Sequence, residues 1–530
     1  MPPRSHPGKA TPELRSPQQG MLARCRLSRV SQSQILTRTL AADHVTPVRA
    51  YNALRAQSAG RSSFLLESVL PGERWGRYSI LGYRARTEHA YPPGASALDL
   101  LAGDAAELED AEGLAARFSQ ALVGYLVYDA ANVANGIKPW PNEGMSGRLM
   151  RDCTVVVFDN LQQTLTIAGR SKGAIDRCAL EMTHGPELDP LPSPDPSLEA
   201  LFAEPNIDDD MYAAKVVKAK QYIEAGDCLQ IVLARTFRAP MRNADAFDVY
   251  RALRVLSPSP YLFFLDFAET PFAEGMAIAG ASPETMVRVS GGKVTLRPIA
   301  GTRKRGATQE EDEALERELV ADPKERAEHV MLVDLARNDV GRVAAPGSVS
   351  VTSEMRVHRF SHVMHLVSEV EGTLAPDKSP IDAVRSAMPA GTLSGAPKVR
   401  AMQIIRQLEP GPRGVYGGAI GYVLPDGTVD FAIPIRTVIA RGADFEVTAG
   451  AGIVADSDPL REAEETRMKA RAALAAIRSA QDAVERREAE AAALQKRREE
   501  AERKKAEAAA ANAEGGGEGS AGSNEPGATS

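Results

Sequence analysis

The middle of the chain contains the stretch Lys324-Glu325-Arg326-Ala327-Glu328-His329-Val330-Met331-Leu332-Val333-Asp334-Leu335. We expect it to be part of a helix over residues 310–335, and a further helix is expected over 462–477. Strands are expected on both sides of this stretch, among them 295–298 and 420–424. Few strand–helix–strand units follow one another in tandem. The sequence therefore favours an α+β fold with large antiparallel β-sheets flanked by helices over a doubly wound parallel sheet.

Length and composition are those of an ordinary soluble globular protein, because 43% of the 530 residues are hydrophobic and 25% are charged. That length corresponds to roughly two to four domains. The 63 basic and 70 acidic side chains give a net charge of −7, which is too balanced for a protein whose main partner is nucleic acid. No apolar run approaches the roughly 18–20 residues of a membrane span. The four cysteines are scattered without a Cys-x-x-Cys pair, which favours the reducing cytoplasm.

Composition changes along the chain and predicts five regions. They are a disordered N-terminal extension over 1–45, an N-terminal region over 46–182, a linker rich in Pro and acidic residues over 183–207, a main domain over 208–478 and a C-terminal tail over 479–530. The first 20 residues lack the apolar core of a secretory signal, and Met21 is an alternative start.

The tail is predicted to be a charged helix followed by a disordered Gly/Ser segment. Residues 482–514 carry eight basic and nine acidic side chains, and only Val484 and Leu494 could anchor an apolar seam. A solvated helix is therefore expected rather than a coiled coil. A scaffold that binds partners through this helix is an alternative class of function.

Two pairs of glutamates lie on predicted helices, Glu325 with Glu328 and Glu462 with Glu465. A spacing of three residues places each pair on one helix face. Two such helices facing each other would form an all-oxygen site suited to Mg²⁺. From spacing alone, however, such pairs are more often solvated surface residues.

Three glycine-rich turns could bind an anion through backbone N–H groups: 298–303, 391–398 and 450–452. None has the spacing of a P-loop or of a dinucleotide-binding turn, so a nucleotide site is disfavoured. Tight turns without a ligand are the plain alternative for each of them. Their occurrence in one domain, with Arg436 near a fourth stretch at 417–418, favours binding of a small carboxylate.

Two residues are candidates for proton transfer. His365 stands within the stretch 361–368, where a single histidine is more often structural without further context. Glu284 lies just after an apolar strand, where burial could raise its pKa and make it a general acid. Nucleophilic Ser or Cys chemistry is unsupported, because no Gly-x-Ser-x-Gly or Gly-x-Cys-x-Gly is present.

Four motifs in order carry a resemblance to a known family. They are 298–306, 332–339, 391–398 and 450–456, the last followed by the glutamates at 462 and 465. In this order they resemble the chorismate-utilising enzymes, and specifically the anthranilate synthase component I family. The resemblance covers about residues 45–478, and it implies that the region 46–182 is regulatory and that 208–478 is the chorismate-binding catalytic domain.

The resemblance implies a role for each candidate residue. Mg²⁺ would hold the ring carboxylate of chorismate on Glu328 and Glu465, with Glu325 and Glu462 close by. His365 would take part in the loss of pyruvate, Glu284 would protonate the leaving C4 hydroxyl, and Thr392 would line the same cleft. The implied chorismate-binding residues are Gly301, Thr302, Tyr416, Arg436, Gly450, Ala451 and Gly452.

Two positions distinguish among members of the family. Isochorismate and salicylate synthases carry a lysine that activates water where this chain has Gln230, and a glutamine amide cannot act as that base. Aminodeoxychorismate synthases often carry a lysine, able to attack C2, where this chain has Ala300. Ammonia as direct nucleophile and anthranilate as product are therefore expected. Aminodeoxychorismate and aminodeoxyisochorismate synthases remain alternatives, the latter disfavoured by His365.

The resemblance also implies feedback inhibition by tryptophan. The implied binding residues are Glu67 and Ser68 in one segment and Pro260, Tyr261 and Leu262 in another. A core strand and a Pro-rich turn are the plain alternative. Ser257 and Leu262 depart from the commoner Asn and Met of the family.

A glutamine amidotransferase subunit, anthranilate synthase component II, is the expected partner, in a heterotetramer of two large and two small subunits. An amidotransferase of that type needs a cysteine at a nucleophile elbow. None of the four cysteines here has that surrounding sequence, and the tail is too short and too polar to form such a domain.

Overall fold

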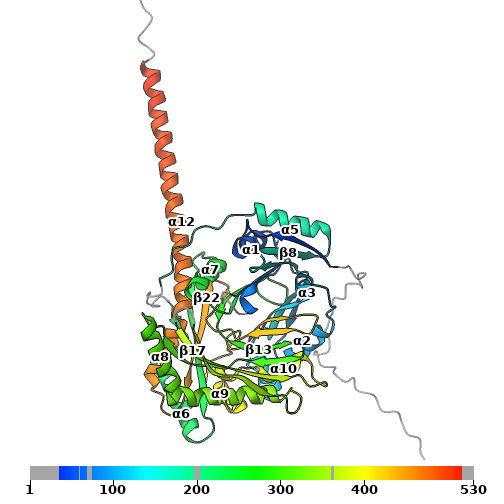
Figure 1. Ribbon diagram of the computed structural model, residues 1–530. Coiled ribbons are helices and arrows are strands. Elements are labelled where there is room, and N and C mark those ends of the chain that lie inside the picture. The colour runs from blue at the N-terminus through cyan, green and yellow to red at the C-terminus, as the bar shows by residue number, and fades with distance from the viewer. Residues whose placement is uncertain (1–34, 59, 69–73, 196–202, 360–362, 516–530) are drawn as a thin grey trace, which may run out of the picture.

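The structure is a computed structural model that describes residues 35–58, 60–68, 74–195, 203–359 and 363–515. Two large antiparallel β-sheets pack against each other through a shared hydrophobic core (Figure 1). This arrangement confirms the predicted α+β class with antiparallel sheets flanked by helices. The expectations for the first 34 residues, including Met21, and for 516–530 lie outside the described residues.

The larger sheet has 12 strands. In spatial order they are β1 (Leu36–Ala41), β8 (Thr164–Gly169), β7 (Thr154–Asp159), β3 (Tyr78–Tyr83), β2 (Ser63–Glu67), β11 (Tyr261–Phe267), β12 (Met276–Ser282), β21 (Thr437–Arg441), β22 (Asp444–Ile453), β10 (Gln230–Pro240) and β18 (Gly395–Ala396), with β9 (Glu204–Pro205) paired to β10.

The smaller sheet has 10 strands. In spatial order they are β15 (Ile299–Lys304), β17 (Val363–Thr373), β14 (Lys293–Leu296), β13 (Thr285–Ser290), β20 (Val429–Ala432), β19 (Ala419–Val423), β5 (Leu122–Leu126), β6 (Gly147–Arg151) and β4 (Thr87–Tyr91), with β16 (Ser350–Arg359) paired to β17.

Both sheets combine strands from the predicted N-terminal region and from the predicted main domain. In the larger sheet β2 pairs with β11, where Glu67 lies opposite Leu262. In the smaller sheet β5 pairs with β19, where Gly124 lies opposite Gly421. The buried residues between the sheets come from both regions as well. The two parts of the chain therefore share their sheets and their core.

Helices cover the sheets on their outer faces. They are α1 (Pro47–Ala56), α2 (Ala97–Ala106), α3 (Leu114–Gln120), α4 (Ala130–Ala134), α5 (Lys172–His184), α6 (Asp209–Glu224), α7 (Ala246–Leu256), α8 (Gln309–Ala321), α9 (Pro323–Gly341), α10 (Pro380–Ala387), α11 (Lys398–Leu408) and α12 (Pro459–Gly515), with short 3-10 turns at Arg74–Arg77 and Gly391–Leu393. A second core places α1, α5, α7 and α12 on the larger sheet. No helix in the described part of the chain is long and apolar enough to cross a membrane.

The predicted disordered extension over 1–45 is wrong for its last part. Leu36–Ala41 forms β1, which pairs with β8 over six residues, from Leu36 opposite Gly169 to Ala41 opposite Thr164. The side chains of β1 are mostly exposed, so the segment carries little of the apolar pattern by which a strand is predicted. Its backbone hydrogen bonds to the sheet edge supply the order.

The predicted single helix over 310–335 is two helices that meet at Asp322. Pro323 disfavours helical geometry at the residue before it and has no N–H to continue the first helix. Asp322 instead caps α9, because its side chain accepts hydrogen bonds from the N–H groups of Lys324 and Glu325. The break aims α9 and its two glutamates across the end of the smaller sheet, against β15 and β17.

The predicted helix over 462–477 and the charged helix of the tail are one element, α12, of 57 residues. Buried residues such as Ala473, Leu474 and Ile477 pack its first half on the larger sheet. Val484 is the last residue packed against that core, whereas Leu494 is exposed. Beyond this point the helix projects from the body of the molecule as a straight arm (Figure 1), as expected of a solvated helix.

Candidate active site

His365 and the first glycine-rich segment meet where β15 pairs with β17. The prediction of a turn over 298–303 is wrong for residues 299–303, which belong to strand β15, and only the ladder irregularity between Ala300 and Thr302 departs from regular pairing. Thr302 lies opposite His365 in the register, and His365 Nδ1 is 2.9 Å from the Gly301 carbonyl oxygen and 3.1 Å from Thr302 Oγ1. Since a carbonyl oxygen only accepts, we assign the ring proton to Nδ1, which donates to Gly301. Burial lowers the pKa of His365. The histidine is thus a neutral imidazole whose Nε2 is the basic nitrogen.

Gly301 is required by its surroundings. Its φ is +66°, in the left-handed region that favours glycine. A Cβ at this position would lie 2.9 Å from a methyl carbon of Leu319 and 3.2 Å from Glu325 Oε2. This segment of β15 therefore brings a backbone carbonyl, His365 and one of the predicted metal-binding glutamates together.

The four predicted metal-binding residues gather on α9 and α12, and we call Glu325, Glu328, Glu462 and Glu465 the carboxylate cluster. The pKa of Glu328 is raised first by burial and then by the charges of Glu325 and Glu465. The pKa of Glu462 is raised by burial and by Glu465. Both helices therefore turn carboxylates toward one cleft, as the spacing predicted.

The carboxylate cluster offers only oxygen ligands to a divalent cation such as Mg²⁺. The described residues contain no set of three or more His, Cys, Asp or Glu side chains arranged to hold a metal ion, and Glu325 forms an ion pair with Arg303 at 3.1 Å. Mg²⁺ is usually bound through one or two carboxylates together with water and an anionic substrate. The carboxylates of Glu328 and Glu465 supply only oxygen atoms from two facing helices, and such a donor set fits that requirement.

Glu284 lies at the end of β12, and only 8% of it is exposed. Burial raises its pKa to about 7, and the positive charge of Lys469 opposes this shift. The Thr392 hydroxyl, on the turn at Gly391–Leu393, is close enough to oppose the shift as well, although it does not meet hydrogen-bond geometry. Near neutral pH the carboxyl can therefore hold a proton and donate it.

Arg436 is a half-buried cation without a carboxylate partner in the described residues. Its Nη1 donates to Ser257 Oγ at 3.3 Å, and burial lowers its pKa. The charge of Arg436 also lowers the pKa of His365, which places the two residues in the same cleft. A desolvated guanidinium of this kind is suited to an anionic ligand.

Residues 450–452 form one wall of the cleft. The prediction that they are a turn is wrong, because they lie inside strand β22 and pair with residues 232–234 of β10. A Cβ on Gly450 would lie 2.9 Å from Tyr416 Oη, and a Cβ on Gly452 would lie 2.5 Å from Gln230 Nε2. Gln230 is buried, and its Oε1 has no hydrogen-bond partner in the described residues. The Ala451 side chain lies in a hydrophobic core with Ile231, so of the residues predicted to bind chorismate this one can contribute only its main chain.

Sequence reasoning missed Lys469. Its Nζ lies 2.7 Å from Glu465 Oε1 and donates to the Gly450 carbonyl oxygen at 3.1 Å. The available signal was its position four residues after Glu465, which places both side chains on one helix face.

The four motifs lie within one region of the chain that is similar to known proteins. Residues 75–475 match the chorismate binding enzyme family. The chain belongs to that family. It is 42% identical over 482 residues to anthranilate synthase component 1 of Acetivibrio thermocellus, covering 84% of this chain and 95% of that protein.

Solved structures of chorismate-binding enzymes support the same assignment. The crystal structure of anthranilate synthase component I from Streptococcus pneumoniae superposes with a TM-score of 0.66 at 34% identity, over 82% of this chain and 99% of that one. The menaquinone-specific isochorismate synthase of Escherichia coli superposes with a TM-score of 0.64 at 19% identity, over 84% and 94% of the two chains. The second likeness shows the shared fold alone.

The residues predicted to bind tryptophan come together in this chorismate-binding enzyme around a cavity of about 460 Å³. Glu67 accepts a hydrogen bond from Tyr250 Oη at 2.7 Å, and Ser68 Oγ is buried without a partner in the described residues. Pro260, Tyr261 and Leu262 line the same cavity, and Leu262 on β11 pairs in register with Glu67 on β2. The structure thus brings all five residues together.

Sequence reasoning missed part of this cavity. Asp430 lines it, and burial raises the pKa of Asp430 to about 6, while Tyr261 Oη and Tyr422 Oη donate to its carboxyl at 3.0 and 3.3 Å. Arg288 also lines the cavity. These residues belong to strands β13 and β20 of the smaller sheet. No sequence motif indicated that these strands line the same cavity as β2 of the larger sheet.

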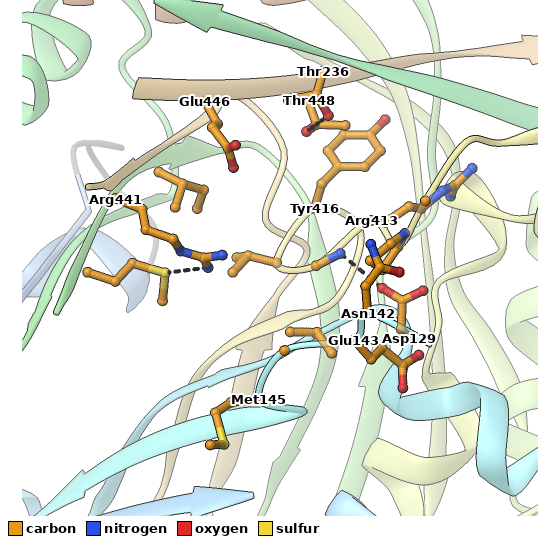
Figure 2. Close-up of a pocket in the computed structure, with 18 of the residues that line it drawn as sticks. Asp129, Asn142, Glu143, Met145, Thr236, Arg413, Tyr416, Arg441, Glu446 and Thr448 are labelled. Atoms are coloured by element: carbon orange, nitrogen blue, oxygen red, sulfur yellow. Dashed lines mark hydrogen bonds between the residues drawn. The ribbon is translucent and has the colours of Figure 1, made fainter. Parts of the chain in front are cut away.

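A larger cavity of about 710 Å³ opens elsewhere in the chorismate-binding enzyme, and of the predicted site residues only Tyr416 lines it (Figure 2). Asp129, on its wall, accepts hydrogen bonds from Gly414 N and Trp140 Nε1, and burial raises the pKa of Asp129 to about 6. Tyr416 thus lies between this cavity and Gly450 on β22.

Proposed function

We propose that the chain converts chorismate and ammonia to anthranilate, pyruvate and water, as the larger component of an anthranilate synthase in tryptophan biosynthesis. Its relationship to anthranilate synthase component 1 supports the reaction class. The observation that carries the proposal is a protonatable carboxyl, Glu284, in one cleft with a neutral imidazole, His365, and an amide, Gln230, in place of a lysine.

Binding of chorismate follows from the charges of the cleft. Arg436 would pair with a carboxylate of the substrate. The backbone of residues 301–302 and 450–452 would contact the oxygen atoms of the substrate, and Tyr416 would lie against Gly450. Glu328 and Glu465 would hold Mg²⁺, with Glu325 and Glu462 beside them. The bound cation would supply a Lewis acid that draws electron density from the conjugated ring through its carboxylate.

The chain's own groups supply the proton transfers. Ammonia attacks C2 of the ring while the C4 hydroxyl leaves, and Glu284 would protonate the departing oxygen so that water is released. Thr392, beside Glu284, would orient that carboxyl. Loss of the C2 proton and of the enolpyruvyl group as pyruvate then yields the aromatic ring, and His365 Nε2 is the base available on that side of the cleft.

The proposed function includes inhibition by tryptophan and assembly with a second subunit. Tryptophan would bind in the cavity lined by Glu67, Ser68 and Pro260–Leu262 and inhibit the reaction. A separate glutamine amidotransferase subunit would supply ammonia, in a heterotetramer of two large and two small subunits. A cytoplasmic location agrees with the cysteines of the described residues, Cys153, Cys178 and Cys228, which are buried and unpaired.

A product assay tests the proposed reaction. The purified chain, chorismate, Mg²⁺ and a high concentration of ammonium should yield anthranilate and pyruvate in equal amounts, identified by mass and fluorescence. Omission of ammonium should abolish the product. Formation of isochorismate or salicylate without ammonium, or accumulation of an amino-deoxychorismate that keeps its enolpyruvyl group, would contradict the proposal and assign the chain to another reaction of the family.

A further inference from the structure

Lys469 lies among the acidic groups of the cleft and contacts two walls of it. Its Nζ is 2.7 Å from Glu465 Oε1 on α12 and 3.1 Å from the Gly450 carbonyl oxygen on β22. Its positive charge also lowers the pKa of Glu284, Glu328 and Glu462. One ammonium group is therefore the counter-charge for the catalytic carboxyl and for the carboxylate cluster together.

We propose that Lys469 is the cation paired with Glu465 in the carboxylate cluster, as Arg303 is paired with Glu325, and that it competes with the divalent cation for Glu465. The inference rests on the proposed function, in which Glu465 is a ligand of Mg²⁺. An ammonium group and a divalent cation on one carboxylate repel each other at short range. Lys469 must therefore move away from Glu465 before that carboxylate can ligate the metal fully.

The plain alternative is an ordinary surface ion pair between residues four apart on a helix, which stabilises a helix only slightly. Lys469 and Glu465 are about half exposed, 53% and 45%. The contact of Lys469 with Gly450 distinguishes it from such a pair, because it ties the helix to the sheet. The pair Arg503–Glu507, farther along α12 at 3.4 Å and more exposed, has the same spacing, and the structure shows no such second contact for it.

Release of Lys469 would have a second effect. The Gly450 carbonyl oxygen, which now accepts a hydrogen bond from Lys469, belongs to the part of β22 that is expected to bind chorismate. When the lysine leaves, both a carboxylate oxygen and this carbonyl oxygen become available in the cleft. The divalent cation and the substrate would then together take the place of the Lys469 ammonium group. The affinity for the metal in the absence of substrate would therefore be lower than that of a carboxylate cluster without Lys469.

Binding of Mn²⁺ to the full chain without chorismate tests the inference, with Mn²⁺ as a probe for an oxygen-ligand divalent site and free Mn²⁺ read by electron paramagnetic resonance. Lys469→Met keeps a good helix former and removes the charge. We expect this variant to bind Mn²⁺ about threefold to tenfold more tightly than the wild-type chain.

Lys324→Met is the matched control. The charge of Lys324 also lowers the pKa of Glu328 and Glu462, but within the described part of the chain Lys324 forms no ion pair with them. We expect its replacement to change the Mn²⁺ affinity less than twofold. Unchanged or weaker Mn²⁺ binding in Lys469→Met, or equal tightening in both variants, would overturn the inference of direct competition.

The same measurement separates this inference from the proposed function. Glu465→Gln and Glu328→Gln should lose Mn²⁺ binding at least tenfold if the carboxylate cluster is the metal site. Retained binding in both would contradict the metal site itself, whatever the Lys469 variant does. Loss of binding in both, with no gain in Lys469→Met, would contradict the competition alone.

Discussion

Glu284 owes its chemistry to burial, which raises its pKa from about 4.5, its ordinary value, to about 7. Its proton is present below that pH, so a rate that needs the protonated acid should fall as pH rises through about 7. Glu284→Gln cannot donate, and we expect kcat to fall by about 10²–10⁴ and the alkaline decline to disappear from the remaining activity. Steady-state rates between pH 5.5 and 9 in both proteins measure this. A variant that kept the wild-type pH profile would exclude Glu284 as the acid.

The same carboxyl links pH to stability. Because the folded pKa lies above the unfolded one, the folded state binds the proton more tightly, and stability falls as pH rises from about 4.5 to 7. At pH 8 the buried charge therefore costs free energy that a neutral glutamine avoids. Glu284→Gln should be more stable than the wild-type chain at pH 8 by on the order of 2–3 kcal/mol, and the gain should vanish at pH 4.5.

Ser68 is the residue through which inhibition can be separated from catalysis. Its hydroxyl is buried in the wall of the 460 Å³ cavity, without a partner in the described residues. Ser68→Phe would fill part of this cavity, so we expect tryptophan inhibition to be lost while turnover without tryptophan stays within about threefold. Inhibition curves at saturating chorismate give the comparison. An unchanged curve would place the inhibitor elsewhere.

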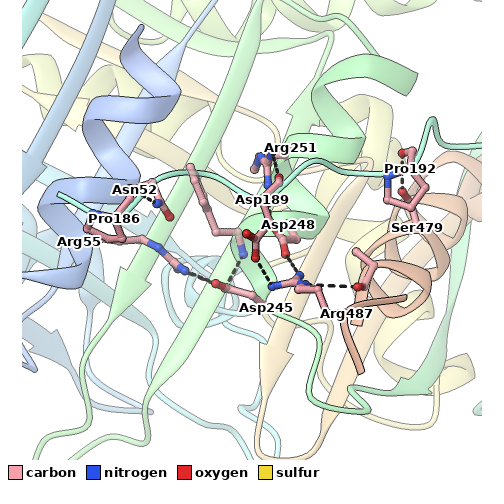
Figure 3. A network of polar contacts seen from close by, with 12 residues as sticks. Asn52, Arg55, Pro186, Asp189, Pro192, Asp245, Asp248, Arg251, Ser479 and Arg487 are labelled. Carbon is pink, nitrogen blue, oxygen red and sulfur yellow. Dashed lines mark hydrogen bonds and ion pairs between the residues drawn. The ribbon is translucent and has the colours of Figure 1, made fainter. Parts of the chain in front are cut away.

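At the scale of elements, α12 does more than carry the predicted glutamates. Figure 3 shows the segment 185–195 held across α7 and α12 by a network of polar contacts. Arg487 pairs with Asp248 at 2.8 Å and with Asp189 at 3.0 Å, and Ser479 Oγ donates to the Pro192 carbonyl oxygen at 3.3 Å. The first part of the predicted tail thus fixes the segment 185–195 to the body of the molecule, and we call the contacts of Ser479 and Arg487 the clasp.

Truncation should divide the tail at this clasp. A chain that ends at Gln495 keeps Arg487 two turns inside the helix, and we expect its activity and its protease resistance to match those of the full chain. A chain that ends at Gln481 loses Val484 and Arg487, so the segment 185–195 should be cleaved about tenfold faster, equivalent to about 1.4 kcal/mol of local stability. Arg487→Met in the full chain should give part of that increase. Equal cleavage of all four proteins would contradict a clasp.

Local sequence signals predicted some elements well and failed where neighbours decide. The strands expected at 295–298 and 420–424 overlap β14 and β19, and these strands and the helix pairs of glutamates follow from short-range patterns. The motif residues at 301, 365 and 436 meet in one cleft. Pro323 alone could have predicted the break between α8 and α9. The strand Leu36–Ala41 could not be predicted from its exposed side chains, and its order comes from pairing with a strand more than 120 residues away.

At the scale of the whole molecule, the two sheets unite what the sequence suggested were separate regions. Pairing of β2 with β11 and of β5 with β19 closes the cavity of about 460 Å³ with residues from both regions. Ser257, three residues before Pro260 in that cavity, accepts a hydrogen bond from Arg436 in the cleft. Such long-range pairing carries no local signal, so the cavity could not be located before the fold was known. The position of Lys469 four residues after Glu465 places both on one face of α12 but does not reveal its contact with Gly450 on β22.

The source of ammonia is a property of the whole chain and gives the last prediction. Cys153, Cys178 and Cys228 are buried, and burial raises the pKa of each thiol, whereas an amidotransferase needs an accessible thiolate beside a base. The purified chain should therefore make anthranilate from chorismate with ammonium but not with glutamine, at least 100-fold more slowly with glutamine at equal concentration. Addition of a separate amidotransferase subunit should restore the glutamine reaction. Anthranilate formed by the isolated chain from glutamine, with ammonium removed enzymatically, would show that this chain contains its own glutaminase.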